Sequence, residues 1–211
     1  VRADQAFRPA VIDSFEAQDH PMDLAYPGGP PVPPYDITGW TVASQMGIQF
    51  DRVLDGFTGP FQPIGFNLEA PQAAQVSGPA SPAGWLVSHK INDSFIVMNR
   101  LLKAGADVYW LKQEQTVAGH GLGTGTLWIP ASAVSKPIVE RAARELGVPA
   151  YGVAQAPKGE AMKLKPIRIG LVDVYGGSMP SGWTRWIFEN YEFPFEVVFP
   201  QVLDAGNLKA S

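Results

Sequence analysis

The stretch from residue 166 to residue 200 constrains the fold of this chain most strongly. The run Ile167–Val174 is mostly apolar and rich in β-branched residues, which is typical of a strand covered on both faces. A glycine-containing loop, Tyr175–Pro180, follows it. Beyond Pro194, the run Phe195–Phe199 is typical of a second strand. Two strands joined by a helical crossover form a βαβ unit, whose crossover is expected to be right-handed.

The crossover between these strands has the pattern of an amphipathic helix. Ser181 is expected to cap its N-terminus. The apolar positions recur at helical spacing and predict a buried face made of Trp183, Trp186, Ile187 and Tyr191. The helix is therefore expected to pack on its own pair of strands.

Residues 84 to 153 repeat the alternation of strand and helix. Short apolar runs predict strands at 85–88, 106–111, 126–129 and 148–153. One helix, capped by Asn92 or Asp93 and closed by Gly105, should bury Phe95, Met98, Leu101 and Leu102. Another, capped by Ser135 and closed by Gly147, should bury Ile138, Val139, Ala142 and Leu146. This alternation predicts an α/β fold of the Rossmann or flavodoxin type, with a parallel or mixed sheet and helices on both faces.

Three sections of the chain are expected. Residues 1–34 contain a short helix within 7–18 and then a Pro/Gly run, which predicts an extended tether. Residues 35–165 form an α/β section, beginning with a helix capped by Thr38 and a strand at 48–54. Residues 166–211 form the βαβ section. Its last helical pattern has no strand after it, so we expect the natural protein to continue.

Bulk composition excludes several classes of function. The net charge of −4 and the pI near 5.3 argue against a nucleic-acid surface, which needs a basic face. The chain has no cysteine, which excludes disulfides and a cysteine nucleophile. No apolar run reaches the roughly 20 residues that span a bilayer, so no membrane partner is expected.

The loop after the first strand of the βαβ unit is the candidate binding site. Open α/β sheets bind ligands beyond the carboxyl ends of their strands, and Tyr175–Gly182 is expected there. The candidate ligand-binding residues are Tyr175, Ser178, Ser181 and Trp183. The plainer interpretation is that Ser181 caps the helix and that Trp183 and Trp186 pack in the core.

Other motifs give no catalytic or metal-binding residue. The glycine-rich Gly119–Gly125 lacks the spacing of a dinucleotide fingerprint and leads into a strand, so a hairpin or surface loop is expected. His20, His89 and His120 lie far apart in sequence and lack the spacing of a zinc site. No GxSxG elbow is present.

Several strings occur in an order that suggests a family. They are Asp4-Gln5-Ala6-Phe7-Arg8-Pro9, Tyr26-Pro27-Gly28-Gly29-Pro30-Pro31, Tyr35-Asp36-Ile37-Thr38-Gly39-Trp40-Thr41, Gln45-Met46-Gly47, Asn99-Arg100-Leu101-Leu102-Lys103-Ala104-Gly105 and Gly182-Trp183-Thr184-Arg185-Trp186. Over nearly its whole length the chain resembles the region downstream of the catalytic domain in bacterial zinc carboxypeptidases, the carboxypeptidase A-like metallopeptidases. In that family this region leads into a segment similar to class I glutamine amidotransferases.

The resemblance implies a secreted or periplasmic parent whose zinc is held by an upstream catalytic domain. The HxxE motif, the later His and the catalytic Glu of the family have no match here, so no catalytic residue and no cofactor are expected in this chain. The expected function is a non-catalytic accessory region that packs against the peptidase domain of the same polypeptide. A small-ligand or peptide-binding domain is the alternative, and a hydrolase with an unrecognised serine site is a third.

Overall fold

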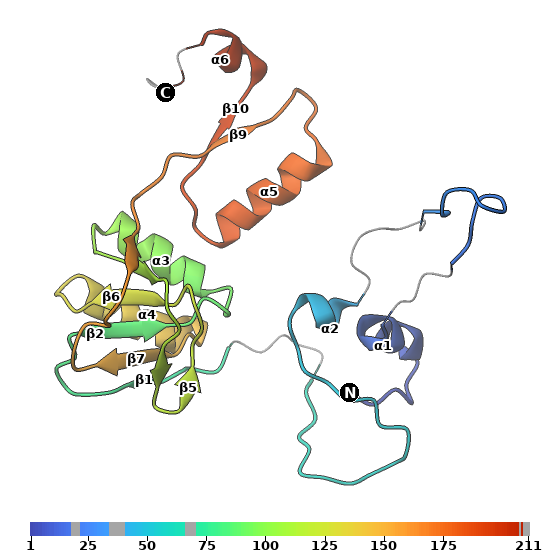
Figure 1. The fold of residues 1–211 in the computed structure, drawn as a ribbon, viewed down its shortest axis with the longest axis horizontal. Coiled ribbons are helices and arrows are strands. Elements are labelled where there is room, and N and C mark those ends of the chain that lie inside the picture. The colour runs from blue at the N-terminus through green and yellow to red at the C-terminus, as the bar shows by residue number, and fades with distance from the viewer. Residues whose placement is uncertain (18–21, 34–40, 66–70, 207, 209–211) are drawn as a thin grey trace. The chain divides into compact units, whose positions relative to one another are not determined.

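The computed structural model describes residues 1–17, 22–33, 41–65, 71–206 and 208. It divides the chain into two units, residues 1–66 and residues 67–211 (Figure 1). All three sheets of the described residues lie in the second unit.

The larger sheet has six strands and is mixed. In spatial order they are β1 (Val76–Ser77), β7 (Ala150–Val153), β2 (Gly84–Val87), β6 (Leu127–Pro130), β3 (Tyr109–Leu111) and β8 (Ala161–Lys163). β1 pairs with β7 in parallel, and the other neighbours pair antiparallel. The prediction of an α/β fold with a mixed sheet is confirmed.

Two interlocked crossovers organise this sheet. α3 (Ser94–Lys103) connects β2 to β3, and α4 (Ser135–Leu146) connects β6 to β7. In the sheet, β6 lies between β2 and β3, and β2 lies between β6 and β7. The order β7-β2-β6-β3 is the split βαβ, or ferredoxin-like, arrangement. The structure therefore gives no Rossmann or flavodoxin-like order of strands.

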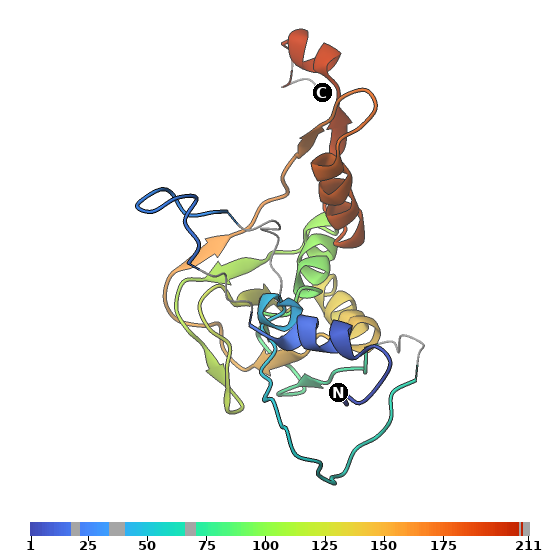
Figure 2. The same cartoon turned by 90° about the vertical axis from the view of Figure 1, so that its right-hand side faces the viewer.

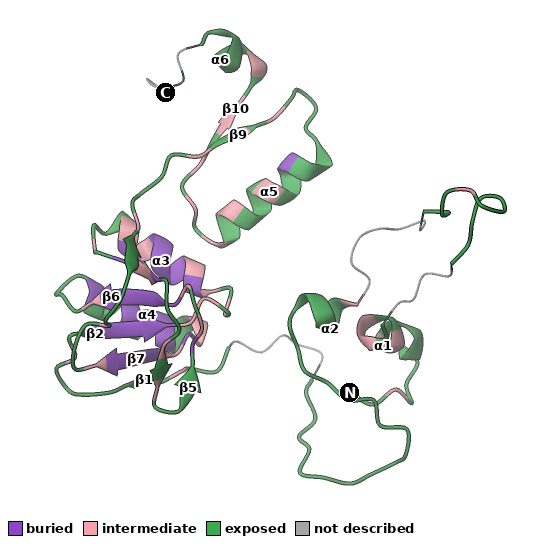
Figure 3. Ribbon diagram, viewed as in Figure 1, coloured by how far each residue is buried: buried purple, intermediate pink, exposed green. Residues whose placement is uncertain are grey.

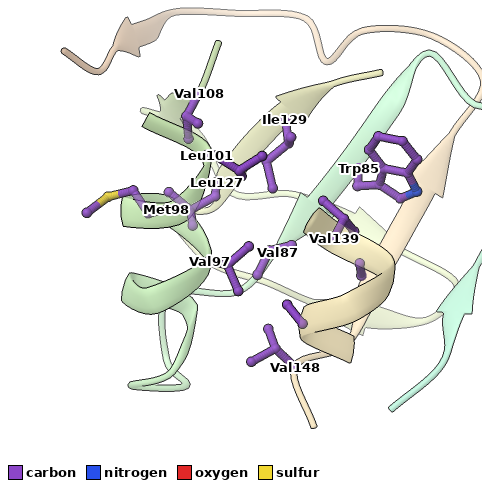
Figure 4. Close-up of a cluster of buried hydrophobic side chains, with 12 residues drawn as sticks. Trp85, Val87, Val97, Met98, Leu101, Val108, Leu127, Ile129, Val139 and Val148 are labelled. Carbon is purple, nitrogen blue, oxygen red and sulfur yellow. The ribbon is translucent and has the colours of Figure 1, made fainter. Parts of the chain in front are cut away.

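Both helices cover the same face of the sheet. Trp85 and Val87 of β2 point into the main core with residues of α3 and α4 (Figure 4). Leu86 belongs to a second, smaller cluster. The two helices also contact each other (Figure 2). The prediction of helices on both faces is thus wrong for the described part of this sheet. β2 and β6 run in opposite directions and their crossovers move in opposite directions, so two right-handed crossovers reach one face.

The second face of the sheet is covered by a hairpin. β4 (Thr116–Val117) and β5 (His120–Gly121) pair antiparallel around a turn in which Ala118 and Gly119 have φ of 49° and 81°. Leu122, just after the hairpin, is buried against Leu86 and Trp128. A hairpin or surface loop was expected at the glycine-rich stretch, and the structure has a hairpin there.

The predicted βαβ unit is present as a separate two-stranded sheet. β9 (Gly170–Val172) and β10 (Glu196–Val198) pair in parallel and are joined by α5 (Met179–Asn190). α6 (Pro200–Asp204) follows. The expectation of a strand buried on both faces is wrong, because Val172 is 52% exposed. Two short strands have one helix to cover them, so their other face stays open.

Residues 1–66 form little regular structure. The described residues of this unit contain α1 (Arg8–Phe15), α2 (Val42–Gln45) and a bridge between Leu24 and Pro31. The predicted strand at 48–54 is wrong, since a strand needs a hydrogen-bonded neighbour and this segment pairs with none in the described residues. The predicted cap Thr38 lies outside the described residues. Figure 3 shows that burial is concentrated in the six-stranded sheet with α3 and α4.

Candidate functional site

The candidate site is the loop between β9 and α5 together with the first turns of α5. The structure places Tyr175 and Ser178 in the loop and Ser181 and Trp183 in α5. Gly176 and Gly177 have φ of 90° and 73°, in the left-handed region that glycine adopts most easily. The Gly177 amide donates to the Val174 carbonyl over 2.9 Å, which closes a tight turn. The loop therefore follows the carboxyl end of β9 directly, as predicted.

Ser178 and Ser181 bond to each other across the first turn of α5. The Ser181 amide donates to Ser178 Oγ over 3.2 Å, and Ser181 Oγ donates to the Ser178 carbonyl over 3.0 Å. Ser178 is thus the cap, and the prediction that Ser181 caps the helix is wrong. Pro180 lies in the first turn, where its missing N–H costs nothing, so α5 begins at Met179, before Ser181.

At α4, too, the capping serine lies three residues before the predicted one. The Ser135 amide donates to Ser132 Oγ over 3.0 Å, and the Ser132 amide donates to Ser135 Oγ over 2.9 Å. This reciprocal pair is a capping box in which Ser132, not the predicted Ser135, accepts the bond from the helix. Both helices use the first serine of an S-x-x-S pattern.

The aromatic residues of the site are exposed. Tyr175 is 83% exposed and stacks on Phe199 with ring centroids 5.5 Å apart. Trp183 is 62% exposed and meets Trp186 edge-on at 6.0 Å. The expectation that both tryptophans pack in the core is wrong. The more buried face of α5 consists of Ser181, Thr184 and Phe188, and of the four residues predicted for it only Tyr191, just after the helix, is part-buried on this side.

This arrangement offers aromatic surface and no activated nucleophile. Ser178 Oγ and Ser181 Oγ are both engaged in the cap. The nearby Arg185 donates from Nε to Glu189 Oε1 over 2.8 Å, and this hydrogen bond raises the pKa of Arg185. Among the described residues, no histidine hydrogen-bonds to either serine. Stacking on a ligand or partner is the chemistry that the site can supply.

The described histidines lie in other places. The ring of His89 packs beneath Gly125, and the ring of His120 lies 5.1 Å from that of Tyr151. His20 is outside the described residues. Within the described ranges, no three His, Asp or Glu side chains are grouped so that they could hold a metal ion.

Sequence reasoning missed one groove on the six-stranded sheet. It has a volume of about 340 Å³ and lies at the N-terminus of α4, where its lining includes Ser81, Trp85, Ser132 and Lys136. The signal in the sequence is Lys136, a cation in the first turn of a helix, where the dipole favours an anion. Lys136 Nζ lies 3.9 Å from Glu140 Oε1, which offsets this charge.

No family model, curated protein or solved structure matches the chain. Among the described residues, no helix is long and apolar enough to cross a membrane.

Proposed function

We propose that this chain is a non-catalytic accessory region of a secreted zinc carboxypeptidase-like protein. It packs against the upstream peptidase domain, which holds the zinc, and stabilises that domain or positions its peptide substrate. The ordered strings that resemble the region downstream of such peptidases support this proposal.

The observation that carries the proposal is the exposed apolar surface of the described residues in the unit 1–66. Ala43 is the one hydrophobic residue of this unit that is buried among the described residues. Large side chains that remain exposed include Phe7, Leu54, Phe57, Phe61 and Ile64. Each such side chain gains about 1.5–3 kcal/mol when it is buried. A segment with this surface and so little core is expected to bind another protein surface.

The test combines the full chain with the peptidase domain encoded upstream in the same reading frame. We expect the two to co-elute in size-exclusion chromatography and the chain to raise the peptidase's kcat/KM or its melting temperature. The double variant Phe57→Ser, Phe61→Ser should weaken association. Met162→Ser, at an exposed position of the other unit, is the matched control. Absence of association and of any rate change, or a reading frame without an HxxE domain, would refute the proposal.

A second candidate function is peptide or small-ligand binding at the β9–α5 loop. The exposed Tyr175 and Trp183 favour it, because aromatic rings next to a glycine turn can stack on a ligand. A ligand from a panel of peptides, sugars and nucleotides should raise the melting temperature, and Tyr175→Ala should abolish that shift. If no compound raises the melting temperature, the loop is not a ligand site.

A further inference from the structure

The C-terminus of α5 has an unusual residue at its left-handed position. The Phe193 amide donates to the Phe188 carbonyl over 2.9 Å, and the Glu192 amide donates to the Glu189 carbonyl over 3.3 Å. This pair of bonds is a Schellman motif, and the rings of Phe188 and Phe193 add the apolar contact that usually accompanies it, at 5.8 Å. Glu192 has φ of 56° at the position where glycine is normal.

The side chain of Glu192 supplies a reason for this choice. Arg100 of α3 donates from Nε to both carboxylate oxygens over 3.1 Å and from one terminal nitrogen to Oε1 over 2.7 Å. The two side chains are 29% and 42% exposed for Arg100 and Glu192, so the pair is partly shielded from water. A glycine at this position would fit the backbone better but could not reach Arg100.

The neighbours of Glu192 also contact α3. Asn99, which is 7% exposed, donates from Nδ2 to the Tyr191 carbonyl over 2.8 Å. Phe193 lies 6.4 Å from the ring of Phe95 and packs against the main core. Three consecutive residues, Tyr191–Phe193, therefore each make a different kind of contact with the same helix. We call this segment the docking turn.

We propose that the docking turn is the device that seats the βαβ unit on α3, and that Glu192 is kept in a left-handed conformation because its carboxylate must reach Arg100. The six-stranded sheet and the βαβ unit are joined covalently through residues 165–168, which are exposed. Loss of the Arg100–Glu192 pair should let the βαβ unit swing about this connector while both sheets remain folded. The inference goes beyond the proposed accessory function and does not depend on it.

The decisive variant is Glu192→Gly in the full chain. Glycine relieves the left-handed backbone, so the cap of α5 is retained or improved, while the contact with Arg100 is lost. A structural role confined to capping α5 would make this variant neutral or stabilising in every measurement. A docking role makes the βαβ unit mobile. The two explanations therefore predict opposite results.

The measurement is the distance between spin labels on Arg144→Cys in α4 and Gln201→Cys in α6, both exposed. The absence of native cysteine makes the labelling specific. We expect one narrow distance distribution in the labelled parent and a broad one in Glu192→Gly. Because an ion pair with this much exposure is screened by water, the open population should rise by about two- to fivefold. Glu189→Gln, which breaks an exposed ion pair on the same helix, is the control and should keep the narrow distribution.

Amide exchange in α3 and β6 reports whether the main sheet remains folded. If Glu192→Gly loses this protection, Glu192→Asn replaces it with the same expectations, because asparagine also suits a left-handed backbone and its side chain is one carbon shorter. A narrow distribution in the folded variant, or a broad one in the labelled parent, would overturn the proposal.

Discussion

Leu101 should be among the most sensitive positions of the main core. It lies on α3 with none of its surface exposed and packs in the cluster formed with β2, β6 and α4. Leu101→Ala removes buried carbon atoms and leaves a cavity, which costs about 2–5 kcal/mol. For a domain of about 150 residues, each kcal/mol lowers Tm by about 2–4 °C, so we expect a fall of about 4–20 °C.

Leu102→Ala is the matched control, because Leu102 is the next residue of the same helix and is only half-buried. Both changes replace leucine by alanine within one helix, so helix propensity cancels. Urea unfolding, monitored by tryptophan fluorescence, should show that Leu101→Ala loses at least twice as much free energy of unfolding as Leu102→Ala, with the m-value unchanged. Equal losses would refute the assignment of the α3 face that meets the sheet.

Three further predictions concern the caps, the sheet and pH. Ser178→Ala should cost about 1 kcal/mol in α5, because the Ser181 amide loses its acceptor, and amide exchange at the start of α5 checks this. Gly84→Ala should destabilise the β2–β6 pair by about 1–3 kcal/mol in urea unfolding, because a Cβ would overlap the Ile129 carbonyl, whereas Gly121→Ala meets no neighbour and should be neutral. The hydrogen bond from Arg100 lowers the pKa of Glu192. The ionised Glu192 therefore stabilises the folded state above the unfolded-state pKa of about 4.3, and this stabilisation is lost as pH falls through the lower folded pKa. Between about pH 5 and pH 3, Glu192→Gln should therefore lose less free energy of unfolding than the parent chain. An identical pH profile in parent and variant would contradict this.

The helices of the second unit were predictable because their patterns are local. α3, α4 and α5 occur where amphipathic spacing placed them, and Gly105 and Gly147 adopt the expected left-handed φ at the ends of α3 and α4. Val139 and Ala142 are buried as expected. The order of strands was not predictable, since nothing in the local pattern of β2–α3–β3 says that β6 lies between the two strands.

The face of α5 shows the limit of periodicity. Trp183, Trp186 and Ile187 fit helical spacing, but so do Thr184 and Phe188, one position further along. A helix on a two-stranded sheet buries only one narrow face, and hydrophobicity alone favours the tryptophans. The loop was thus placed correctly between a strand and a helix, while the orientation of the tryptophans was not.

The displaced caps have a similar cause. In an S-x-x-S pattern either serine can accept a bond from the helix, and the choice depends on where the first turn closes. Ser178 and Ser132 are selected because Met179–Pro180 and Ala133–Val134 already turn with the helix. Strands β1 and β8 were missed because they are two and three residues long and their residues are exposed.

Above all, we propose that this chain carries no catalytic centre of its own. The direct measurement is zinc titration of the full 211-residue chain by calorimetry, followed by assay of the zinc-treated chain on peptides for release of C-terminal residues. We predict no stoichiometric zinc binding and no turnover. Binding of one zinc ion per chain that is lost in His89→Ala or His120→Ala, or release of a C-terminal residue by the isolated chain, would contradict the account.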